Sequence, residues 1–577
     1  MRVLWKQIYR IRGWLIAGLT LALLNAASDL FLPTVMAKIV DNGVAKGDIV
    51  YLKHETVIML IAAGAAVVIK YGKNICAIKS GNGYARNQRQ ALFEHVMLFS
   101  PTDAENFGAA SLITRATSDV TQVANIIDTF VRMMVRIPIT CIGGLLLTFA
   151  LDPEMAWVIL AVVPLIFIIS IRAFMSTLPH FSKIQSLLDR LSRLLRENLS
   201  GIRVVRAFNK EHFEEERIGK TNREISETNQ AAEMTLGQLS PLMTLLVNLT
   251  IVALVAYAIL RSGAGKTKIG VLIACIQYAN QILSSVVQTS MLFSRIPRAA
   301  VSIRRIAEVM EKEPTVRDGE KGAECLTEKG EEIVRFDRVS YYFPKAKDDT
   351  VHDLSFSLRR GETTAIIGST GAGKTTVVRL LERFFDVTGG RILFKGVDIR
   401  DLEQKALRDR IAPVLQKAYL FSGSIAYNLS MGAEGNDAEM EEALRVAEAK
   451  EFTDQFPEGL EHRLAAGGND LSGGQKQRLS IARALMRDAD LYIFDDSFSA
   501  LDFATDARLR AALKPRLKNA ATLVIAQRVS TIRDADNILV MDAGRIIASG
   551  RHEELMETSE VYREIVSSQG LLGGETA

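Results

Sequence analysis

The sequence predicts an α-helical membrane domain followed by a soluble α/β domain. Long apolar runs punctuate the first 300 of the 577 residues and are absent from the remainder. From residue 332 onward, short β-branched or apolar strands alternate with helical stretches, as they do in α/β domains. A charged, Gly-containing stretch separates the two patterns. We therefore expect a membrane domain with two intracellular loops over 1–305, a linker over 306–331 and a second domain over 332–577.

The composition excludes several other classes of protein. Apolar residues make up 48% of the chain, charged residues make up 24%, and the formal net charge is only +4. This balance gives no case for nucleic-acid binding, so we expect no nucleic-acid partner. The four cysteines have no CxxC spacing and are too few for a disulfide scaffold. A secreted disulfide protein and a zinc-cluster protein are therefore excluded.

Six segments are long and apolar enough to cross a bilayer, whose hydrocarbon core needs about 20 residues of helix. They are 14–36, 56–78, 133–151, 155–177, 240–260 and 269–293. The first could be a cleaved signal peptide, but the five further spans favour a retained anchor. An even number of spans places both chain ends on one side. The basic N-terminus and the Lys/Arg-bearing segments 79–132 and 178–238 assign that side to the cytoplasm.

The two long cytoplasmic segments have continuous helical periodicity, which predicts helices that extend far below the membrane. Each segment is interrupted once, at 100–111 and at 200–211. The expected membrane domain therefore has six long transmembrane helices with cytoplasmic extensions.

A phosphate-binding loop marks the α/β domain. The strand TTAII is followed by GSTGAGKT, which fits G-x-x-x-x-G-K-[ST] at every position. Gly371 and Gly373 let backbone N–H groups wrap phosphates, Lys374 adds a positive charge, and Thr375 can hold Mg²⁺. The residues expected to contact a nucleotide are Gly368, Ser369, Thr370, Gly371, Ala372, Gly373, Lys374, Thr375 and Thr376. The loop predicts an α/β P-loop nucleotide-binding domain.

Two further motifs belong to nucleotide chemistry. The strand LYIFD ends in Asp495, which is suited to hold Mg²⁺ at the carboxyl end of the strand. Upstream, LSGGQKQR opens a helix with Ser472, Gly473, Gly474 and Gln475, a second anion-binding helix start. One chain does not need two sites for a terminal phosphate. The second site therefore indicates a nucleotide held by another subunit.

With six spans before them, these motifs resemble an ATP-binding cassette (ABC) exporter half-transporter over essentially the whole chain. The resemblance implies ATP and Mg²⁺ as cofactors. The stretches SLITRATSDV (111–120) and GIRVVRAF (201–208) are similar to the family's two intracellular loops, whose short coupling helices touch the nucleotide domains.

The resemblance also implies roles for single residues. Gln416 matches the family's Q-loop, which senses Mg²⁺ and contacts a coupling helix. Asp502, in SALD, matches the D-loop. Phe343 falls where the family stacks an aromatic ring on adenine. Neighbouring Tyr342 as the stacking ring, or a plain core role for Phe343, are the alternatives.

Two positions depart from the family. Asp496 stands where the catalytic base is a Glu, and misplacing its carboxylate by one methylene can cost about 10²-fold in rate. Gln527 stands where the switch residue is a His. The intact LSGGQ beside this degenerate base and switch favours a heterodimer, in which this chain binds ATP at a slow site and completes the partner's hydrolytic site. A homodimer with a slow Asp base, and an ATP-gated regulatory or channel-like protein, are the alternatives.

Polar residues within the spans do not identify the substrate. Lys70 and Lys73 either face a cavity or lie at the cytoplasmic interface, whereas Arg132 and Arg136 look interfacial. The last span offers Gln277, Asn280, Gln281 and Gln288 to a central cavity. We expect ATP-driven export of amphipathic small molecules, drugs or lipids, across the plasma membrane, with both termini and the nucleotide domain in the cytoplasm. The expected partners are a homologous second half-transporter, membrane lipid and the substrate.

Overall fold

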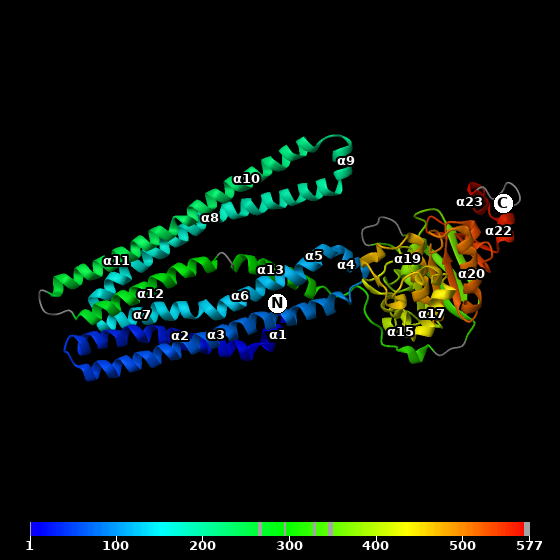
Figure 1. Cartoon of the computed structure of the whole chain (residues 1–577). Helices are drawn as coiled ribbons and strands as arrows, with labels where there is room; N and C mark the ends of the chain where they lie inside the picture. The colour runs from blue at the N-terminus through cyan, green and yellow to red at the C-terminus, as the bar shows by residue number, and fades with distance from the viewer. Residues whose placement is uncertain (1, 263–267, 294–295, 327–329, 344–349, 570–577) are drawn as a thin grey trace. The chain divides into compact units, whose positions relative to one another are not determined.

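The structure is a computed structural model that describes residues 2–262, 268–293, 296–326, 330–343 and 350–569 (Figure 1). The chain divides into two compact units. The first unit, Met1–Leu98 with Glu105–Glu313, consists of helices joined by short turns in its described residues. The second unit, Pro314–Ala577 with Phe99–Ala104, contains all of the described strands.

Six helical segments of the first unit are long and apolar enough to cross a membrane. The expected spans fall in α2 (Arg12–Lys38), α3 (Ile49–Val96), η3 (Phe130–Met134) with α7 (Arg136–Leu151), α8 (Pro153–Ser200), α11 (Leu239–Ser262) and α12 (Ile269–Phe293). Asp48 and Asp152 fix where α3 and α8 begin, because their carboxylates accept hydrogen bonds from first-turn N–H groups. The predicted helical membrane domain is confirmed.

Helices α3 and α8 are much longer than a bilayer requires. Each has 48 residues, about 72 Å at 1.5 Å per residue, against a hydrocarbon core of about 30 Å. After α8, the short α9 (Ile202–Ala207) leads into α10 (Glu211–Gly237), which lies along α8 (Figure 1). The chain after α3 forms α4 (Pro101–Phe107), α5 (Ala109–Thr114), η2 (Arg115–Asp119) and α6 (Val120–Thr129). Both predicted interruptions therefore contain a short helix.

Helix α13 spans Ile296–Glu311. The first residues of the predicted linker, 306–311, are therefore helical. Within the first unit, Arg115 of η2 forms an ion pair with Glu308 of α13 at 3.2 Å. Within the second unit, Asp103 accepts hydrogen bonds from the N–H and the hydroxyl of Thr315, at 2.9 and 2.6 Å. The first contact lies wholly within the first unit, and the second lies wholly within the second unit. The predicted domain limits remain predictions.

A six-stranded sheet forms the centre of the second unit, in the order β12-β11-β3-β10-β9-β6. Its strands are β3 (Thr363–Gly368), β6 (Ile411–Val414), β9 (Leu491–Asp495), β10 (Ala521–Ile525), β11 (Asn537–Asp542) and β12 (Arg545–Gly550). All pairings are parallel except that of β12 with β11. Every residue of β9 and β10 is buried, which explains why these central strands are continuous apolar runs. The strands TTAII and LYIFD, both predicted from the sequence, are β3 and β9.

A second, antiparallel sheet has the order β2-β1-β4-β5. Its strands are β1 (Glu332–Tyr341), β2 (Val351–Arg359), β4 (Gly389–Phe394) and β5 (Val397–Asp398), and a two-stranded ribbon joins β7 (Gly423–Ser424) to β8 (Arg463–Leu464). The main helices of the unit are α14 (Lys374–Leu381), α15 (Gln404–Arg408), α16 (Ile425–Ser430), α17 (Asp437–Val446), α18 (Lys450–Thr453), α19 (Gly473–Leu485), α20 (Phe503–Leu517), α21 (Val529–Ile532), α22 (His552–Thr558) and α23 (Glu560–Ser568). The predicted α/β domain is confirmed.

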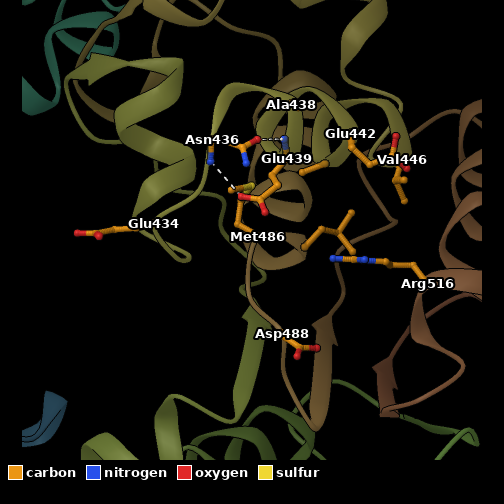
Figure 2. Close-up of a pocket in the computed structure, with 11 residues that line it drawn as sticks. Glu434, Asn436, Ala438, Glu439, Glu442, Val446, Met486, Asp488 and Arg516 are labelled. Atoms are coloured by element: carbon orange, nitrogen blue, oxygen red, sulfur yellow. Dashed lines mark hydrogen bonds between the residues drawn. The ribbon is translucent and has the colours of Figure 1, made fainter.

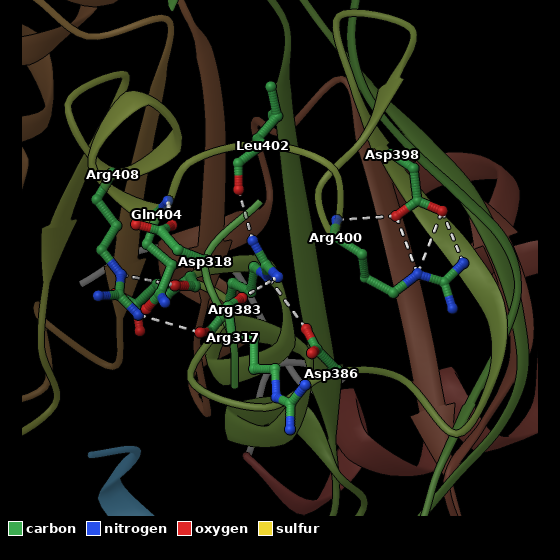
Figure 3. A network of polar contacts seen from close by, with 10 residues as sticks. Arg317, Asp318, Arg383, Asp386, Asp398, Arg400, Leu402, Gln404 and Arg408 are labelled. Carbon is green, nitrogen blue, oxygen red and sulfur yellow. Dashed lines mark hydrogen bonds and ion pairs between the residues drawn. The ribbon is translucent and has the colours of Figure 1, made fainter. Parts of the chain in front are cut away.

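A buried arginine joins the start of the second unit to its core (Figure 3). Arg383, only 2% exposed, donates to the carbonyl oxygens of Leu402 and Arg317 at 2.6 and 2.7 Å. Its Nε lies 3.1 Å from a carboxylate oxygen of Asp386. A guanidinium can be buried at acceptable cost only when its donors are partnered in this way. Residue 383 therefore fixes the segment around Arg317 against the nucleotide domain.

We predict that Arg383→Met lowers the stability of the second unit by about 2–5 kcal/mol, because two buried carbonyl groups lose their donors and Asp386 loses its cation. Arg400→Met is the matched control. Arg400 forms an exposed ion pair with Asp398 in the same network, and removing such a pair costs about 1 kcal/mol or less. Thermal unfolding of the full chain in detergent measures both changes. Equal shifts for the two variants would contradict the role assigned to Arg383.

Candidate nucleotide site

The phosphate loop lies between β3 and α14, and its glycines are required by the backbone. Gly371 and Gly373 have φ values of +88° and +96°, in the left-handed region that other residues rarely adopt. A Cβ at Gly371 would meet no atom within 4 Å, so the face of the loop beside it is open. A Cβ at Gly368 would lie 2.0 Å from the carbonyl oxygen of Met541, so this glycine lets β11 pack against β3. The loop thus has the open backbone that phosphate binding requires.

Lys374 lies inside its own loop. Its ammonium group donates to the carbonyl oxygens of Gly368 and Ser369, both at 2.7 Å. Burial lowers the pKa of Lys374, while the carboxylates of Asp496 and Asp495 oppose that change. The loop cation is therefore held beside the two carboxylates that follow β9.

The structure brings the predicted acidic and amide residues together at one edge of the sheet. Asp495 ends β9, and burial with the charge of Asp496 raises its pKa to about 6. Burial also raises the pKa of Asp496, and a hydrogen bond from Gln416 opposes the rise. Gln527 donates from Nε2 to Asp496 Oδ2 at 3.0 Å. These residues follow the neighbouring parallel strands β6, β9 and β10, whose carboxyl ends meet at the usual ligand position of such sheets.

The donor set suits Mg²⁺ bound together with a nucleotide. Thr375, Gln416 and Asp495 offer a hydroxyl, an amide oxygen and one carboxylate, all hard oxygen ligands. The part of the chain that the structure describes has no group of three or more His, Cys, Asp or Glu side chains able to hold a metal ion. Mg²⁺ is commonly held by one or two carboxylates plus substrate phosphates, and this site has that composition.

The LSGGQ segment forms a self-contained helix start. The hydroxyl of Ser472 accepts the N–H of Gln475 at 3.3 Å, and the Gln475 side chain accepts the N–H of Ser472 at 2.9 Å. Gly473 is exposed, and a Cβ there would meet nothing within 4 Å. No hydrogen bond or ion pair among the described residues links Ser472–Gln475 to the phosphate loop. The segment therefore presents an open helix N-terminus that its own loop does not use.

Asp502 and Phe343 have structural contacts of their own. Asp502 caps α20 by accepting the N–H of Thr505 at 2.9 Å. Phe343 follows the end of β1, is partly buried and makes edge-to-face contacts with Tyr341 and Phe385. Tyr342 is 48% exposed. The assignment of the adenine ring to Phe343 stays a prediction, with Tyr342 as the alternative.

Gln569 contacts the segment that carries Gln527, named here the switch loop. No sequence pattern predicted this contact. Its Nε2 donates to the carbonyl oxygen of Gln527 at 2.7 Å, and its Oε1 accepts the N–H of Val529 at 2.9 Å. One amide side chain therefore spans the loop that carries Gln527. Gln569 follows α23, which the buried Tyr562 and Val566 anchor in the core. No motif marks Gln569, and 42 residues separate it from Gln527.

The pocket shown in Figure 2 is separate from this site. It has a volume of about 490 Å³ and is lined by residues around α17, the end of α19, and Arg516 of α20. Asn436 and Glu439 cap one another at its rim, where each side chain accepts the other's N–H at 3.0 Å. None of its lining residues belongs to the predicted nucleotide set.

Comparisons with known proteins agree with this geometry. A family model described as "ABC transporter transmembrane region" matches residues 15–286, and one described as "ABC transporter" matches residues 351–499. An "Uncharacterized ABC transporter ATP-binding protein" of Mycobacterium tuberculosis is 38% identical over 96% of this chain and 95% of its own length. The ATP-dependent lipid A-core flippase of Bordetella pertussis is 30% identical over 98% of this chain and 91% of its own length. The structure of a bacterial Atm1-family ABC exporter with ATP bound is similar with a TM-score of 0.80 at 25% identity, covering 97% of this chain and 99% of that one.

Fold, site and comparisons define a membrane exporter whose helical membrane domain and ATPase domain share one polypeptide. The chain belongs to the ABC transporter family. It is an ATP-hydrolysing transporter that spans the membrane several times and has a cytoplasmic ATPase domain. The predicted family, fold class and ATP-driven transport are confirmed.

We predict that Gln569→Ala loosens the switch loop. The N–H of Val529 loses its acceptor, so amide hydrogen exchange of residues 526–531 should become about five- to tenfold faster, the effect of losing roughly 1 kcal/mol of protection. Gln569→Glu retains the acceptor for Val529 and should give an intermediate rate. Gln455→Ala, which removes an exposed Gln from another helix end, is the control. Unchanged exchange at 526–531 in Gln569→Ala would contradict the contact.

We also predict a pH-dependent stability that depends on Glu382. This side chain is 4% exposed at the end of α14, and burial with the charge of Asp495 raises its pKa to about 7. Because the pKa of Glu382 is higher in the folded state, this side chain stays protonated in the folded protein at pH values at which it is ionised in the unfolded chain, where its pKa is near 4.5. The folded state therefore loses stability as pH rises from about 4.5 to about 7.

Glu382→Gln should remove this cost, so the variant gains about 3 kcal/mol at pH 8 and almost nothing near pH 4.5. Thermal unfolding at the two pH values measures the gain. Glu461→Gln, at an exposed position, is the control and should not change the pH profile. A gain of equal size at both pH values would show that Glu382 does not titrate in this window.

Proposed function

We propose that this chain is one half of a heterodimeric exporter in the plasma membrane, and that its own phosphate loop forms a slow ATP site. In such a dimer each nucleotide lies between the phosphate loop of one chain and the LSGGQ of the other. This chain then supplies Lys374 with its loop to the slow site. Ser472, Gly474 and Gln475 complete the hydrolytic site of the partner. The transported substrates are amphipathic small molecules such as drugs or lipids.

The contact between Asp496 and Gln527 carries the proposal. A general base needs a carboxylate free to take a proton from water at hydrogen-bond distance. Here one oxygen of Asp496 already accepts a hydrogen bond from Gln527, and the side chain is one methylene shorter than Glu. The Gln527 amide cannot carry the positive charge of a protonated His. The two departures from the family thus touch one another, and both act against hydrolysis.

The open LSGGQ segment supports the other half of the proposal. Its helix start is intact and, among the described residues, makes no hydrogen bond or ion pair with the phosphate loop of its own chain. Backbone N–H groups at a helix N-terminus stabilise the charge that shifts during phosphoryl transfer. An LSGGQ segment that is intact beside a weakened base is best explained if it completes a hydrolytic site whose base lies on another chain.

The proposed arrangement predicts two linked results for the affinity-purified transporter. A second polypeptide of similar length should co-purify in equal amount. Gly474→Glu should lower the ATPase rate of that complex by about ten- to a hundredfold or more, because a side chain and a negative charge then oppose the phosphate of the partner's nucleotide. Asp496→Asn should lower the rate less than about twofold, since a slow base contributes little to turnover.

Two controls separate the proposal from its alternatives. Gly474→Ala tests local packing, since its Cβ would lie 3.2 Å from the carbonyl oxygen of Ala500. ATP photolabelling should still mark this chain in Gly474→Glu and should decrease in Lys374→Ala. A transporter purified as one polypeptide whose ATPase falls to background in Asp496→Asn would establish a homodimer with Asp496 as the working base.

A further inference from the structure

A cavity of about 530 Å³ lies in the second unit between helix α20 and the segment that runs from α21 to β11. It is separate from the pocket in Figure 2, and none of its lining residues belongs to the predicted nucleotide set. Cavities of roughly 300–1,000 Å³ hold small ligands in proteins, and such sites combine an apolar surface with a few polar groups. The cavity therefore has the size of a small-molecule site and lies outside the nucleotide site.

The floor of the cavity is apolar. Ala365 of β3, Phe494 of β9 and Val524 of β10 line it, together with Phe498 and Leu513. All five side chains are at most 7% exposed and belong to one core cluster. The cavity thus offers a rigid apolar surface, on which the rings or the hydrocarbon part of a ligand can pack.

Small side chains keep the cavity open. Ala507 and Ala511 lie one turn apart on α20 and line one wall, and Ala535 lines the other wall. Ala507 and Ala511 are both exposed, so the space between the walls is reachable from solvent. A large side chain at Ala511 would fill part of that space.

A buried hydroxyl group in the floor lacks a partner. Thr522 of β10 is 5% exposed and lines the cavity. Its backbone N–H donates to the carbonyl oxygen of Glu362 at 3.0 Å, but its hydroxyl makes no hydrogen bond within the described parts of the chain. A buried polar group usually has a partner, either protein, water or ligand. The hydroxyl of Thr522 is therefore available to a polar atom of a ligand.

The wall formed by α20 carries unpaired positive charge. Lys514 and Lys518 line the cavity one helical turn apart, and neither side chain forms an ion pair with another described residue. Arg510, one turn before Lys514, is paired with Asp506 at 3.2 Å. Because side chains at positions i and i+4 of a helix are neighbours, the charges of the two lysines add at one place.

The opposite wall carries Asp534 and Asp536. The backbone N–H of Thr363 donates to one carboxylate oxygen of Asp536 at 2.9 Å, so part of that carboxylate is already occupied. Asp534 is exposed to solvent. An anionic group of a ligand is therefore favoured beside Lys514 and Lys518, with its apolar part on the floor.

The cavity also touches the elements that carry nucleotide-site residues. Phe494 directly precedes Asp495 in β9, and Phe498 follows Asp496 by two residues. Helix α20, which forms one wall, begins directly after its cap residue Asp502. A ligand in the cavity therefore packs against side chains next to the predicted Mg²⁺ ligand and the predicted base.

We propose that this cavity binds a small amphipathic organic anion, and that the bound anion slows ATP hydrolysis. The anionic group lies beside Lys514 and Lys518, and the apolar part packs on Phe494 and Phe498. With these two rings held in place, the carboxylates that follow β9 are less free to adjust to the nucleotide. This regulation does not depend on whether the transporter is a heterodimer.

The test is a protection experiment on the purified transporter in neutral detergent, with saturating MgATP so that no probe occupies the nucleotide site. Ala511→Cys places a thiol in the cavity, and mass spectrometry of the peptide that contains it follows its reaction with methyl methanethiosulfonate. The probes are 8-anilinonaphthalene-1-sulfonate, its uncharged analogue N-phenyl-1-naphthylamine, and inorganic sulfate. The aromatic anion should protect the thiol at a concentration at least tenfold lower than either other probe. Ala504→Cys, at an exposed position of α20 outside the cavity, is the control and should not be protected.

Two charge changes on the same helix separate binding in the cavity from a general effect of charge. Lys514→Glu should weaken protection by the aromatic anion by about tenfold or more. Arg516→Glu makes the same change of charge two residues further along, but Arg516 lines the pocket of Figure 2, so protection should stay within about twofold of the parent.

The ATPase rate tests the regulatory role. The aromatic anion should slow the parent transporter by about threefold or more, and Ala511→Trp, which fills the cavity, should make the rate insensitive to it. Lys514→Glu should likewise require about tenfold more of the anion for the same inhibition, and it provides the measurement if Ala511→Trp does not fold.

Equal protection by the charged and the uncharged aromatic probe, or equal effects of Lys514→Glu and Arg516→Glu, would overturn the proposed anion site. Protection by sulfate as strong as that by the aromatic anion would mean a site for a free anion and would also overturn it. Protection without a change in ATPase rate, or equal inhibition of the parent and both cavity variants, would overturn the regulatory role. The ATPase rate without probe reports on the transporter itself and is unaffected by these outcomes.

Discussion

A charge removed from water has to be compensated by a partner, and both units of this transporter are arranged around that requirement. In the nucleotide domain, Arg383 is buried because two carbonyl oxygens and Asp386 receive its donors. In the membrane unit, Arg132 is compensated in the same way by Asp128 and Asn74. Charges of this kind hold elements together and do no chemistry. The positions where compensation is incomplete are the ones that indicate ligands.

In the nucleotide site, both the positive and the negative side chains lack full compensation within the protein. Within the described part of the chain, Lys374 donates to carbonyl oxygens of its own loop, while Asp495 and Asp496 lie beside each other with raised pKa values. A nucleotide with Mg²⁺ supplies both missing partners, because its phosphates match the lysine and the loop N–H groups while the metal ion matches the carboxylates. The hydrogen bond from Gln527 already occupies one carboxylate oxygen of Asp496. This contact is the observation on which the proposed slow ATP site rests.

Features that depend on neighbouring residues could be predicted from the amino-acid sequence alone. Six apolar runs, the alternation of strands and helices, the phosphate loop and LSGGQ are all local patterns, and each predicted its element correctly because hydrophobic period and motif spacing are properties of a short segment. The sequence also marked Asp496 and Gln527 as departures, but it did not show that they touch. That contact depends on β9 and β10 being neighbours in the sheet, an order set by crossovers between distant segments. Other contacts likewise join residues far apart in the chain. They are the hydrogen bonds of Gln569 to the switch loop, the hydrogen bond of Lys73 to Asn25 and the ion pair of Arg136 with Asp29. These contacts follow from tertiary packing, because no local pattern encodes which helix or strand packs against which.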